Sequence, residues 1–292
     1  GGYYHSLPGD TLRRFIDTSA EVQRALGFGN EKDHPEVAPS QFEMNYGYSE
    51  ATVGADQVQL YKLIARQVAA QMDLTASFLP KPVANVNGNG CHTNMSIAKK
   101  GKNLFYDKKG QDGLSTFAWS FINRILANGN DICLILNSSV NSYRRLDPHF
   151  EAPNQIKASA INRGAMVRIP LGNEKSARVE LRSIAPDANP YLALYALLRT
   201  GLEGPMPADA GSIGSSMGHG HGNGAFQPPK KSVTVSAEMM NTFTYSAKNR
   251  KPKRIPEYSV AKPATISESA SVRSNGVRFA SAVAAMKKIS AP

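Results

Sequence analysis

The chain has 292 residues, 41% of them hydrophobic, and a formal net charge of +11 at pH 7. That length suffices for one large or two small domains with a sizeable core. Two cysteines are too few for a disulfide framework and fit a reducing compartment. Neither a signal peptide nor an apolar run of about 18 residues is visible, so we expect a cytoplasmic protein without a membrane span.

Hydrophobic spacing predicts four helical segments along the chain. Asp10 can cap the first, which Gly27 ends, and Pro190 lies in the first turn of the last. The predicted helices cover residues 10–27, 51–72, 114–136 and 189–202. The intervening segments that end in residues 34–37 and that cover 141–153 are polar, and we interpret both as loops.

Three short segments alternate polar and apolar residues, which predicts strands with one polar face. These segments are residues 41–48, 91–97 and 176–182. The first reads as a half-buried strand with Glu43 on its polar face, and two further short strands are expected at 75–79 and within 162–170. Residues 87–90, Asn-Gly-Asn-Gly, form a turn-rich link between strands.

The polar faces of these strands carry residue types that suit a metal and an anionic substrate. Carboxylates and one imidazole without thiolates favour Mg²⁺ or Mn²⁺, and guanidinium groups favour carboxylates or phosphates. Together with the Gly-rich turn, this pattern suggests phosphoryl transfer. Each residue alone has a simpler explanation, because a single Glu on a strand is usually solvated and a single His such as His92 is more often structural than a ligand.

The composition changes after Gly204. A segment rich in Gly, Ser and His comes first, and a basic region follows it. The part of the chain after Gly204 carries most of the net positive charge. We expect residues 205–292 to form a basic, flexible or loosely ordered tail beside an ordered region at 1–204. The tail lacks the interleaved aromatic residues of single-strand binders, so no specific nucleic-acid partner is expected.

The order of the motifs resembles the C-terminal part of the catalytic domain of glutamine synthetase over about residues 1–204. The resemblance rests on HPEV, QFEMNY, FLPKP, NGNGCHTNMS, NSYRRLDPHFEAP, NRGAMVRIP, ARVELR and DANPYLALYALL. It implies an α+β fold, in which helices flank a curved, mainly antiparallel sheet, and a homo-oligomer built as double rings. It also implies a ligase that joins L-glutamate and ammonium with ATP, through a γ-glutamyl phosphate, with two Mg²⁺ or Mn²⁺ ions.

The resemblance also implies roles for individual residues. Glu36 and Glu43 would bind the first metal ion, and His92 and Glu180 the second. Glutamate would be held by Asn87, Gly88, Arg145 and Arg182. ATP or its phosphates would be held by Asn94, Ser96, Arg163, Arg168 and Arg178. The two catalytic residues would be Glu151, on the flap that closes the site, and Arg163.

The sequence departs from the family pattern in two ways. It has no counterpart of the family's N-terminal β-grasp domain or of the strand whose Glu-x-Glu pair gives one carboxylate to each metal. Asn94 also stands where many bacterial members have a second His. We therefore expect the chain alone to have little or no activity. Two alternatives stay open: a γ-glutamyl-amine (polyamine) ligase of the same superfamily, and a non-catalytic binding or assembly fragment.

Overall fold

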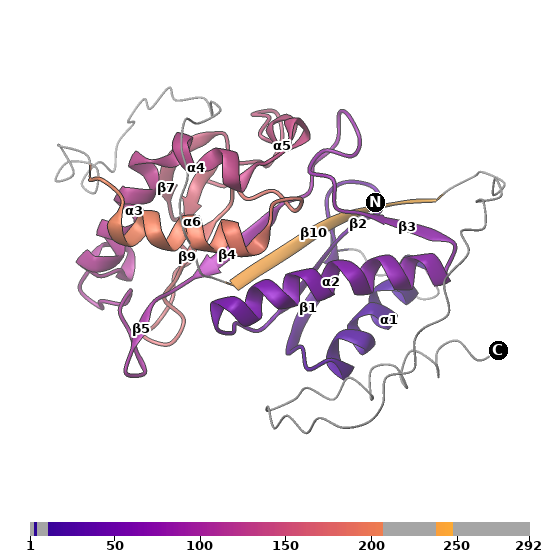
Figure 1. Cartoon of the computed structure of the whole chain (residues 1–292), viewed down its shortest axis with the longest axis horizontal. Helices are drawn as coiled ribbons and strands as arrows, with labels where there is room; N and C mark the ends of the chain where they lie inside the picture. The colour runs from indigo at the N-terminus through magenta and orange to yellow at the C-terminus, as the bar shows by residue number, and fades with distance from the viewer. Residues whose placement is uncertain (1–2, 5–10, 207–237, 248–292) are drawn as a thin grey trace, which may run out of the picture.

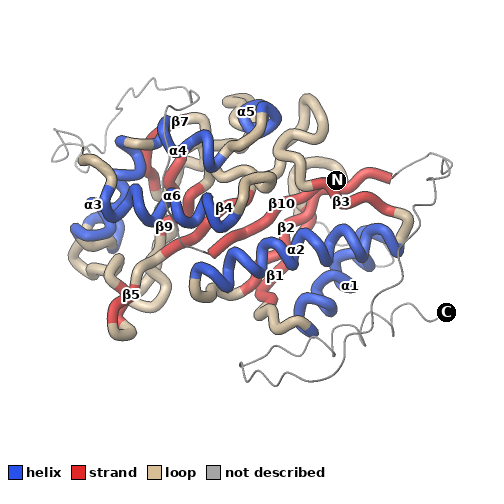
Figure 2. The backbone as a smooth tube through the Cα atoms, in the orientation of Figure 1, coloured by secondary structure: helices blue, strands red, loops and turns tan. Residues whose placement is uncertain are grey.

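The computed structural model describes residues 3–4, 11–206 and 238–247, and its largest feature is an eight-stranded sheet (Figures 1 and 2). The strand order is β1-β2-β10-β4-β9-β8-β7, and β3 also pairs with β10. Among the described strands of this sheet, every pairing is antiparallel except that of β7 with β8. Helices flank the sheet, so the predicted α+β class with a mainly antiparallel sheet is confirmed.

The strands of the large sheet are short, apart from β10. They are β1 Asn30–Pro35, β2 Gln41–Tyr46, β3 Leu74–Ser77, β4 Cys91–Met95, β7 Gln155–Ser159, β8 Ala165–Arg168, β9 Val179–Leu181 and β10 Glu238–Ala247. The strands β5 Ala98–Lys99 and β6 Lys102–Asn103 form a separate hairpin. The helices are α1 Thr11–Ala25, α2 Ala51–Gln71, α3 Thr116–Ala127, α4 Gly129–Leu136, α5 Val140–Arg145 and α6 Pro190–Glu203, with a 3-10 turn η1 at Gln111–Gly113.

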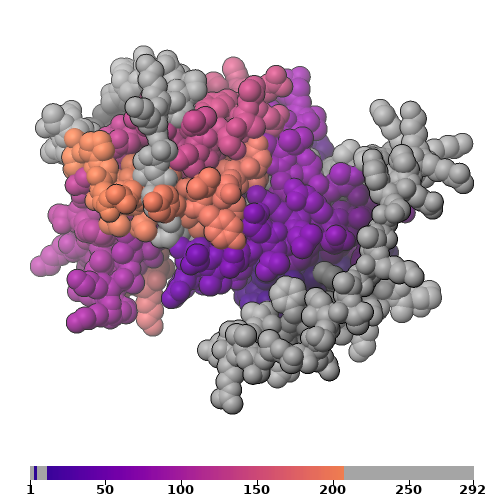
Figure 3. Space-filling view, viewed as in Figure 1, coloured from indigo at the N-terminus to yellow at the C-terminus, as the bar shows by residue number. Residues whose placement is uncertain are grey.

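Two apolar clusters hold these elements together. One joins β4, β8 and β9 to α3 and α6 and includes Phe121, Val179 and Leu197. The other packs α1 and α2 against β2 and includes Phe15 and Tyr61. Burying each large apolar side chain contributes about 1.5–3 kcal/mol. In the space-filling view, the N-terminal and C-terminal parts of the described chain are in contact along a continuous surface (Figure 3). No helix in the described part of the chain is long and apolar enough to cross a membrane.

Several predicted boundaries were wrong. The segment 114–136 is largely helical as predicted, and it is divided into two helices, α3 and α4, which meet at Asn128. The predicted loop before residue 37 contains β1, and the loop at 141–153 begins inside α5. The strand β1 has the sequence NEKDHP, which has no apolar alternation, and it is ordered by pairing with β2. The sequence gives no local signal for such a strand.

The strand β2 is also more enclosed than predicted, because all six of its residues are buried. Its apolar residues Phe42, Met44 and Tyr46 enter the second core cluster. Its polar residues Gln41 and Glu43 line a cavity, so the polar face lies against other polar groups of the protein rather than in solvent.

One segment of the expected tail is a strand instead. The strand β10 lies between β2 and β4 and extends along β3. The helix α6 ends at Glu203 with Gly204 as its C-cap, next to the expected boundary. The remainder of the tail, residues 207–237 and 248–292, lies outside the described residues, so the division of the chain at residue 204 stays a prediction.

Candidate active site

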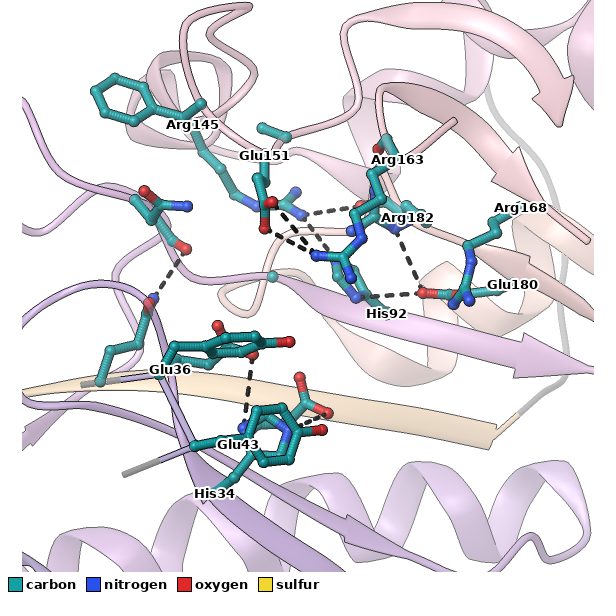
Figure 4. A pocket seen from close by; sticks show the side chains of 18 of the residues that line it. His34, Glu36, Glu43, His92, Arg145, Glu151, Arg163, Arg168, Glu180 and Arg182 are labelled. Atoms are coloured by element: carbon teal, nitrogen blue, oxygen red, sulfur yellow. Dashed lines mark hydrogen bonds and ion pairs between the residues drawn. The ribbon is translucent and has the colours of Figure 1, made fainter. Parts of the chain in front are cut away.

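Most of the predicted site residues line one cavity of about 310 Å³ (Figure 4). Its walls come from β1, β2, β4, β8 and β9, from the turn before β4, and from the loop after α5. The predicted residues that it brings together are Glu36, Glu43, Asn87, Gly88, His92, Arg145, Glu151, Arg163, Arg168, Glu180 and Arg182. In Figure 4, Glu36 and Glu43 lie on one side of the cavity with His34, and the arginines lie on the other side together with His92, Glu151 and Glu180.

Three potential metal ligands form a cluster where β1 meets β2. The register of the two strands places His34 opposite Glu43. His34 Nε2 lies 3.5 Å from Glu43 Oε1, and His34 Nδ1 lies 3.9 Å from Glu36 Oε1. Ligand atoms of the three side chains all lie within 4.8 Å of one another. Two carboxylates and one imidazole fit Mg²⁺ or Mn²⁺.

The three side chains of this cluster shift one another's pKa values. Burial and the charge of Glu43 raise the pKa of Glu36. Burial would raise the pKa of Glu43 too, but the hydrogen bond and charge of His34 lower it overall. In return Glu43 raises the pKa of His34 against the effect of burial. The protein thus keeps Glu43 ionised in a largely enclosed place, which is the state that a cation requires.

A second pair of potential ligands lies across β4 and β9. His92 Nδ1 is 3.4 Å from Glu180 Oε1. Glu180, only 3% exposed, also pairs with Arg168 Nη1 at 2.7 Å and with Arg182 Nε at 3.4 Å. Burial and the surrounding arginines lower the pKa of His92 well below its ordinary value. His92 is therefore neutral at physiological pH, the form that coordinates a metal.

Arg145 shapes the floor of the cavity from the last residue of α5. It is 3% exposed and donates to the carbonyl oxygens of Arg182, Ser183 and Ile184 at 2.9, 3.3 and 3.4 Å. Burial lowers the pKa of Arg145 to about 9. These bonds fix the guanidinium beside His92, whose Nε2 lies 3.4 Å from Arg145 Nη2.

An exposed ion pair lies at the mouth of the cavity. Arg163 Nη1 donates to Glu151 Oε2 at 3.1 Å, and both side chains are more than half exposed. Arg182 Nη1 also donates to the carbonyl oxygen of Arg163. This hydrogen bond connects the mouth of the cavity to its floor. The two residues with predicted catalytic roles are therefore partners of each other and can exchange this contact for a ligand.

Two glycines allow the turn before β4 to approach the arginines closely. A Cβ on Gly88 would lie 2.4 Å from the carbonyl oxygen of Pro80. A Cβ on Gly90 would lie 2.6 Å from Arg145 Nη2. Gln41 Nε2 donates to the carbonyl oxygen of Gly88 at 2.9 Å and so joins the turn to β2. The Asn-Gly-Asn-Gly sequence is needed for packing as well as for turning.

The structure does not bring every predicted residue into the cavity. Asn94, Ser96 and Arg178 do not line it. Arg178 Nε donates to Asn94 Oδ1 at 3.0 Å beyond the end of the cavity, and Ser96 is exposed. Their assignment to ATP stays a prediction.

Sequence reasoning missed several lining residues. Tyr3, Tyr4, Lys32, His34 and Gln41 all line the cavity, and the ring of Tyr4 stacks on that of His34 with centroids 4.1 Å apart. His34 could have been found, because it directly precedes the Pro-Glu of the HPEV motif. The two tyrosines precede the first helix in a segment that reads only as a loop, and nothing local marks them.

Comparison with known proteins identifies the family. The family model for the glutamine synthetase catalytic domain matches residues 1–208. The chain belongs to this family. It is 40% identical over 207 residues to a glutamine synthetase of Staphylococcus aureus (strain MRSA252), covering 70% of this chain and 46% of that protein. A glutamine synthetase of Staphylococcus epidermidis is 41% identical over the same length.

Solved structures of the family give the same result. The cryo-EM structure of Plasmodium falciparum glutamine synthetase matches with a TM-score of 0.64 and 31% identity, covering 69% of this chain and 39% of that one. An apo structure of GmaS without ligand matches with a TM-score of 0.62 and 36% identity, covering 78% of this chain and 53% of that one. The chain spans about half the length of the curated relatives that it matches.

The strand β10 lies between the strands that carry the two ligand clusters. In the register of β10, the residue opposite Glu43 is Thr242, and the residue opposite His92 is Met240. Neither residue type is a preferred ligand of a hard cation.

Proposed function

We propose that this chain supplies most of the catalytic centre of a glutamine synthetase, an ATP-dependent ligase that converts L-glutamate and ammonium into L-glutamine. The observation that carries the proposal is the convergence of two potential ligand clusters and four arginines on one cavity. The γ-carboxylate of glutamate attacks the γ-phosphorus of ATP, giving γ-glutamyl phosphate and ADP. Ammonia then attacks the acyl carbon, and phosphate leaves.

The two clusters would hold two divalent ions. His34, Glu36 and Glu43 offer three donor atoms to one ion, and His92 with Glu180 offer two to the other. When bound, the ions would neutralise charge on the phosphates and polarise the transferred group. The role of His34 adds a ligand to the pair expected from the sequence. The low pKa of His92 keeps its ring free of a proton that would exclude a metal.

The arginines would position the anionic groups of the substrates. Arg182, which is buried and in contact with Glu180, would hold a carboxylate of glutamate beside Asn87 and Gly88. Arg168 and Arg163 lie nearer to the open side, where phosphoryl oxygens would need neutralising. Arg145 is already bonded to three carbonyl oxygens, so it orients the cavity floor rather than binding through a free guanidinium.

Glu151 would act on the amine. Its carboxylate is exposed and, within the described part of the chain, is held by Arg163 alone, so it can accept a proton from ammonium once glutamate and ATP fill the cavity. Removing that proton makes ammonia a nucleophile. Binding of the phosphate by Arg163 would at the same time release Glu151 from its ion pair.

The decisive experiment measures ATP- and Mg²⁺-dependent formation of a γ-glutamyl product, with ADP release as the second readout. It is run on the 292-residue chain and on the protein with all flanking sequence that its gene encodes. We expect turnover in the latter and little or none in the former, because β10 brings no carboxylate opposite Glu43 or His92. Glu180→Gln should abolish that turnover, whereas Glu174→Gln, on an exposed side chain, should not. Unchanged turnover in Glu180→Gln would refute the site.

A γ-glutamyl-amine ligase is the second candidate, and the GmaS structures favour it. The ADP complex of GmaS matches with a TM-score of 0.62 and 33% identity, covering 81% of this chain. Metal and phosphate groups would be shared between the two reactions, and only the amine would differ. Comparing ammonium, methylamine and putrescine as acceptors at equal concentration separates the candidates. Preference for an alkylamine would replace the first proposal with the second.

A non-catalytic binding or assembly role is the third candidate. This role would apply if the protein showed no turnover with any acceptor amine, even with its flanking sequence present. It would also require that Mn²⁺ and ATP still bind. Its own test is the association state, measured by sedimentation with and without nucleotide. Ring-sized homo-oligomers would support the enzyme proposal as well, so the turnover experiment decides between them.

A further inference from the structure

A second cavity, of about 570 Å³, lies apart from the candidate active site and shares no lining residue with it. It is bounded by α2, by β3 and the residues just after it, and by the segment that leads into α6. In Figure 1 these elements meet where the first residues of α6 approach the middle of α2. The volume lies within the usual range for sites that bind small molecules.

Lys62 is the most unusual residue in the wall of this cavity. Its side chain belongs to α2 and is only 8% exposed. Among the described residues it forms no hydrogen bond or ion pair. Burial lowers its pKa, and the more distant charges of Cys91 and Asp187, which would raise it, do not offset this effect. Buried lysines in folded proteins are normally paired directly, whereas Lys62 has no carboxylate within 4.0 Å among the described residues.

Arg66 adds a second positive charge one helical turn further along α2. Its guanidinium lies 5.2 Å from the centre of the Phe78 ring, and it forms no ion pair with another described residue. Asp187 is the carboxylate in the wall, and its Oδ1 accepts a hydrogen bond from Ser142 Oγ at 3.0 Å. Asp187 forms no ion pair within 4.0 Å of Lys62. The positive charges of the wall therefore exceed the negative one.

The remaining wall also favours an anion. The N-terminus of α6, with Asn189 and Pro190, faces the cavity and carries the positive end of the dipole of a 14-residue helix. The hydroxyl groups of Thr75 and Ser77 on β3 can donate hydrogen bonds. Ammonium, guanidinium, helix N-terminus and hydroxyls thus surround one space from three elements.

We propose that this cavity is a binding site for a small phosphate-class dianion, with Lys62 and Arg66 as its charged ligands. The space exceeds what inorganic phosphate needs, so a phosphomonoester with a short polar body fits as well. The ring of Phe78 and the carboxylate of Asp187 would contact that body, the latter by accepting from a hydroxyl group. Binding would supply the counter-charge that Lys62 lacks.

The test measures the melting temperature of the full 292-residue chain in inorganic phosphate, in glycerol phosphate and in chloride at equal ionic strength. Lys62→Met keeps the length of the side chain and removes the charge. Lys99→Met, on the exposed β5–β6 hairpin, is the matched control. Because the candidate active site also carries arginines, the same titrations are run on Arg168→Gln, which leaves the second cavity intact.

We expect both phosphate compounds to raise the melting temperature more than chloride does, and Lys62→Met to lose most of this difference while Lys99→Met and Arg168→Gln keep it. A larger effect of the ester would identify an organic ligand, and an equal effect would identify free phosphate. A phosphate effect in Lys62→Met equal to that of the wild type overturns the proposal. Should Lys62→Met fail to fold, Arg66→Gln, whose side chain is exposed, replaces it with the same expectation.

Discussion

The guanidinium of Arg145 occupies the space that a side chain at position 90 would need. A Cβ on Gly90 would lie 2.6 Å from Arg145 Nη2 and 2.8 Å from His92 Nε2. Both neighbours are fixed, Arg145 by three carbonyl oxygens and His92 by Glu180. The predicted turn therefore also sets the distance between a metal ligand and a buried arginine.

Gly90→Ala should disturb the candidate site and lower stability. The added methyl must displace Arg145 or His92, and such overpacking costs about 1–3 kcal/mol of unfolding free energy. Gly29→Ala is the control, because a Cβ there meets nothing within 4 Å. Urea denaturation of both variants measures the difference. Equal stability of the two variants would show that the turn has more room than the structure indicates.

Glu43→Gln should weaken binding of Mn²⁺. Even the loss of an outer partner of a metal ligand typically costs about 10–100-fold in affinity, so losing a carboxylate donor should cost at least that much. Glu31→Gln, on the same β1–β2 hairpin but exposed, should bind as the wild type does. Electron paramagnetic resonance of free Mn²⁺ measures both. Unchanged affinity in Glu43→Gln would remove this residue from the ligand set.

The site residues that lie on strands with alternating polar and apolar residues were predictable from the sequence. His92 and Glu180 lie on strands whose polar and apolar residues alternate, and their side chains meet because β4 and β9 are neighbours. The pattern gives the face of each strand but not the order of strands in the sheet. In the sequence, the order of the motifs is the only indication that His92 and Glu180 belong to one site.

The remainder was not predictable, for identifiable reasons. β1 is polar throughout and is ordered by its partner strand, so local periodicity does not reveal the strand that carries His34, and only the HPEV motif marks this residue. β10 follows a long Gly-, Ser- and His-containing region, and its place between β2 and β4 depends on contacts distant in sequence. Local periodicity carries no information about either pairing.

Glu180→Ala should be strongly destabilising. It leaves Arg182, which is 6% exposed, without its carboxylate partner, and breaking a buried ion pair costs about 3–5 kcal/mol. Glu174→Ala removes an exposed carboxylate from the same region and should change the unfolding free energy by less than about 0.5 kcal/mol. Urea denaturation tests the contrast. A small effect of Glu180→Ala would mean that Arg182 finds another partner.

Neither cysteine should react with a thiol reagent at about pH 8 in the native protein. Burial raises the pKa of Cys91 to about 12 and that of Cys133 to about 11, and both thiols are enclosed. Thiolate is the reactive form, so little is present. Titration with a disulfide reagent should show no fast reaction in the folded chain and two thiols in urea. Fast labelling of the folded chain would contradict the burial of these side chains.

The stability difference between Lys62→Met and the wild type should depend on pH in phosphate-free buffer. Burial lowers the pKa of Lys62 in the folded state from its ordinary value of 10.5, so the unfolded chain binds more protons between these two values. Stability of the wild type therefore rises with pH through that window, and the variant lacks this contribution. The advantage of Lys62→Met, largest below the lowered pKa of the folded state, should shrink as the pH rises toward 10.5. Lys99→Met, measured in parallel by urea denaturation, controls for removal of one positive charge, and the same pH trend in both variants would contradict the burial of an unpaired Lys62.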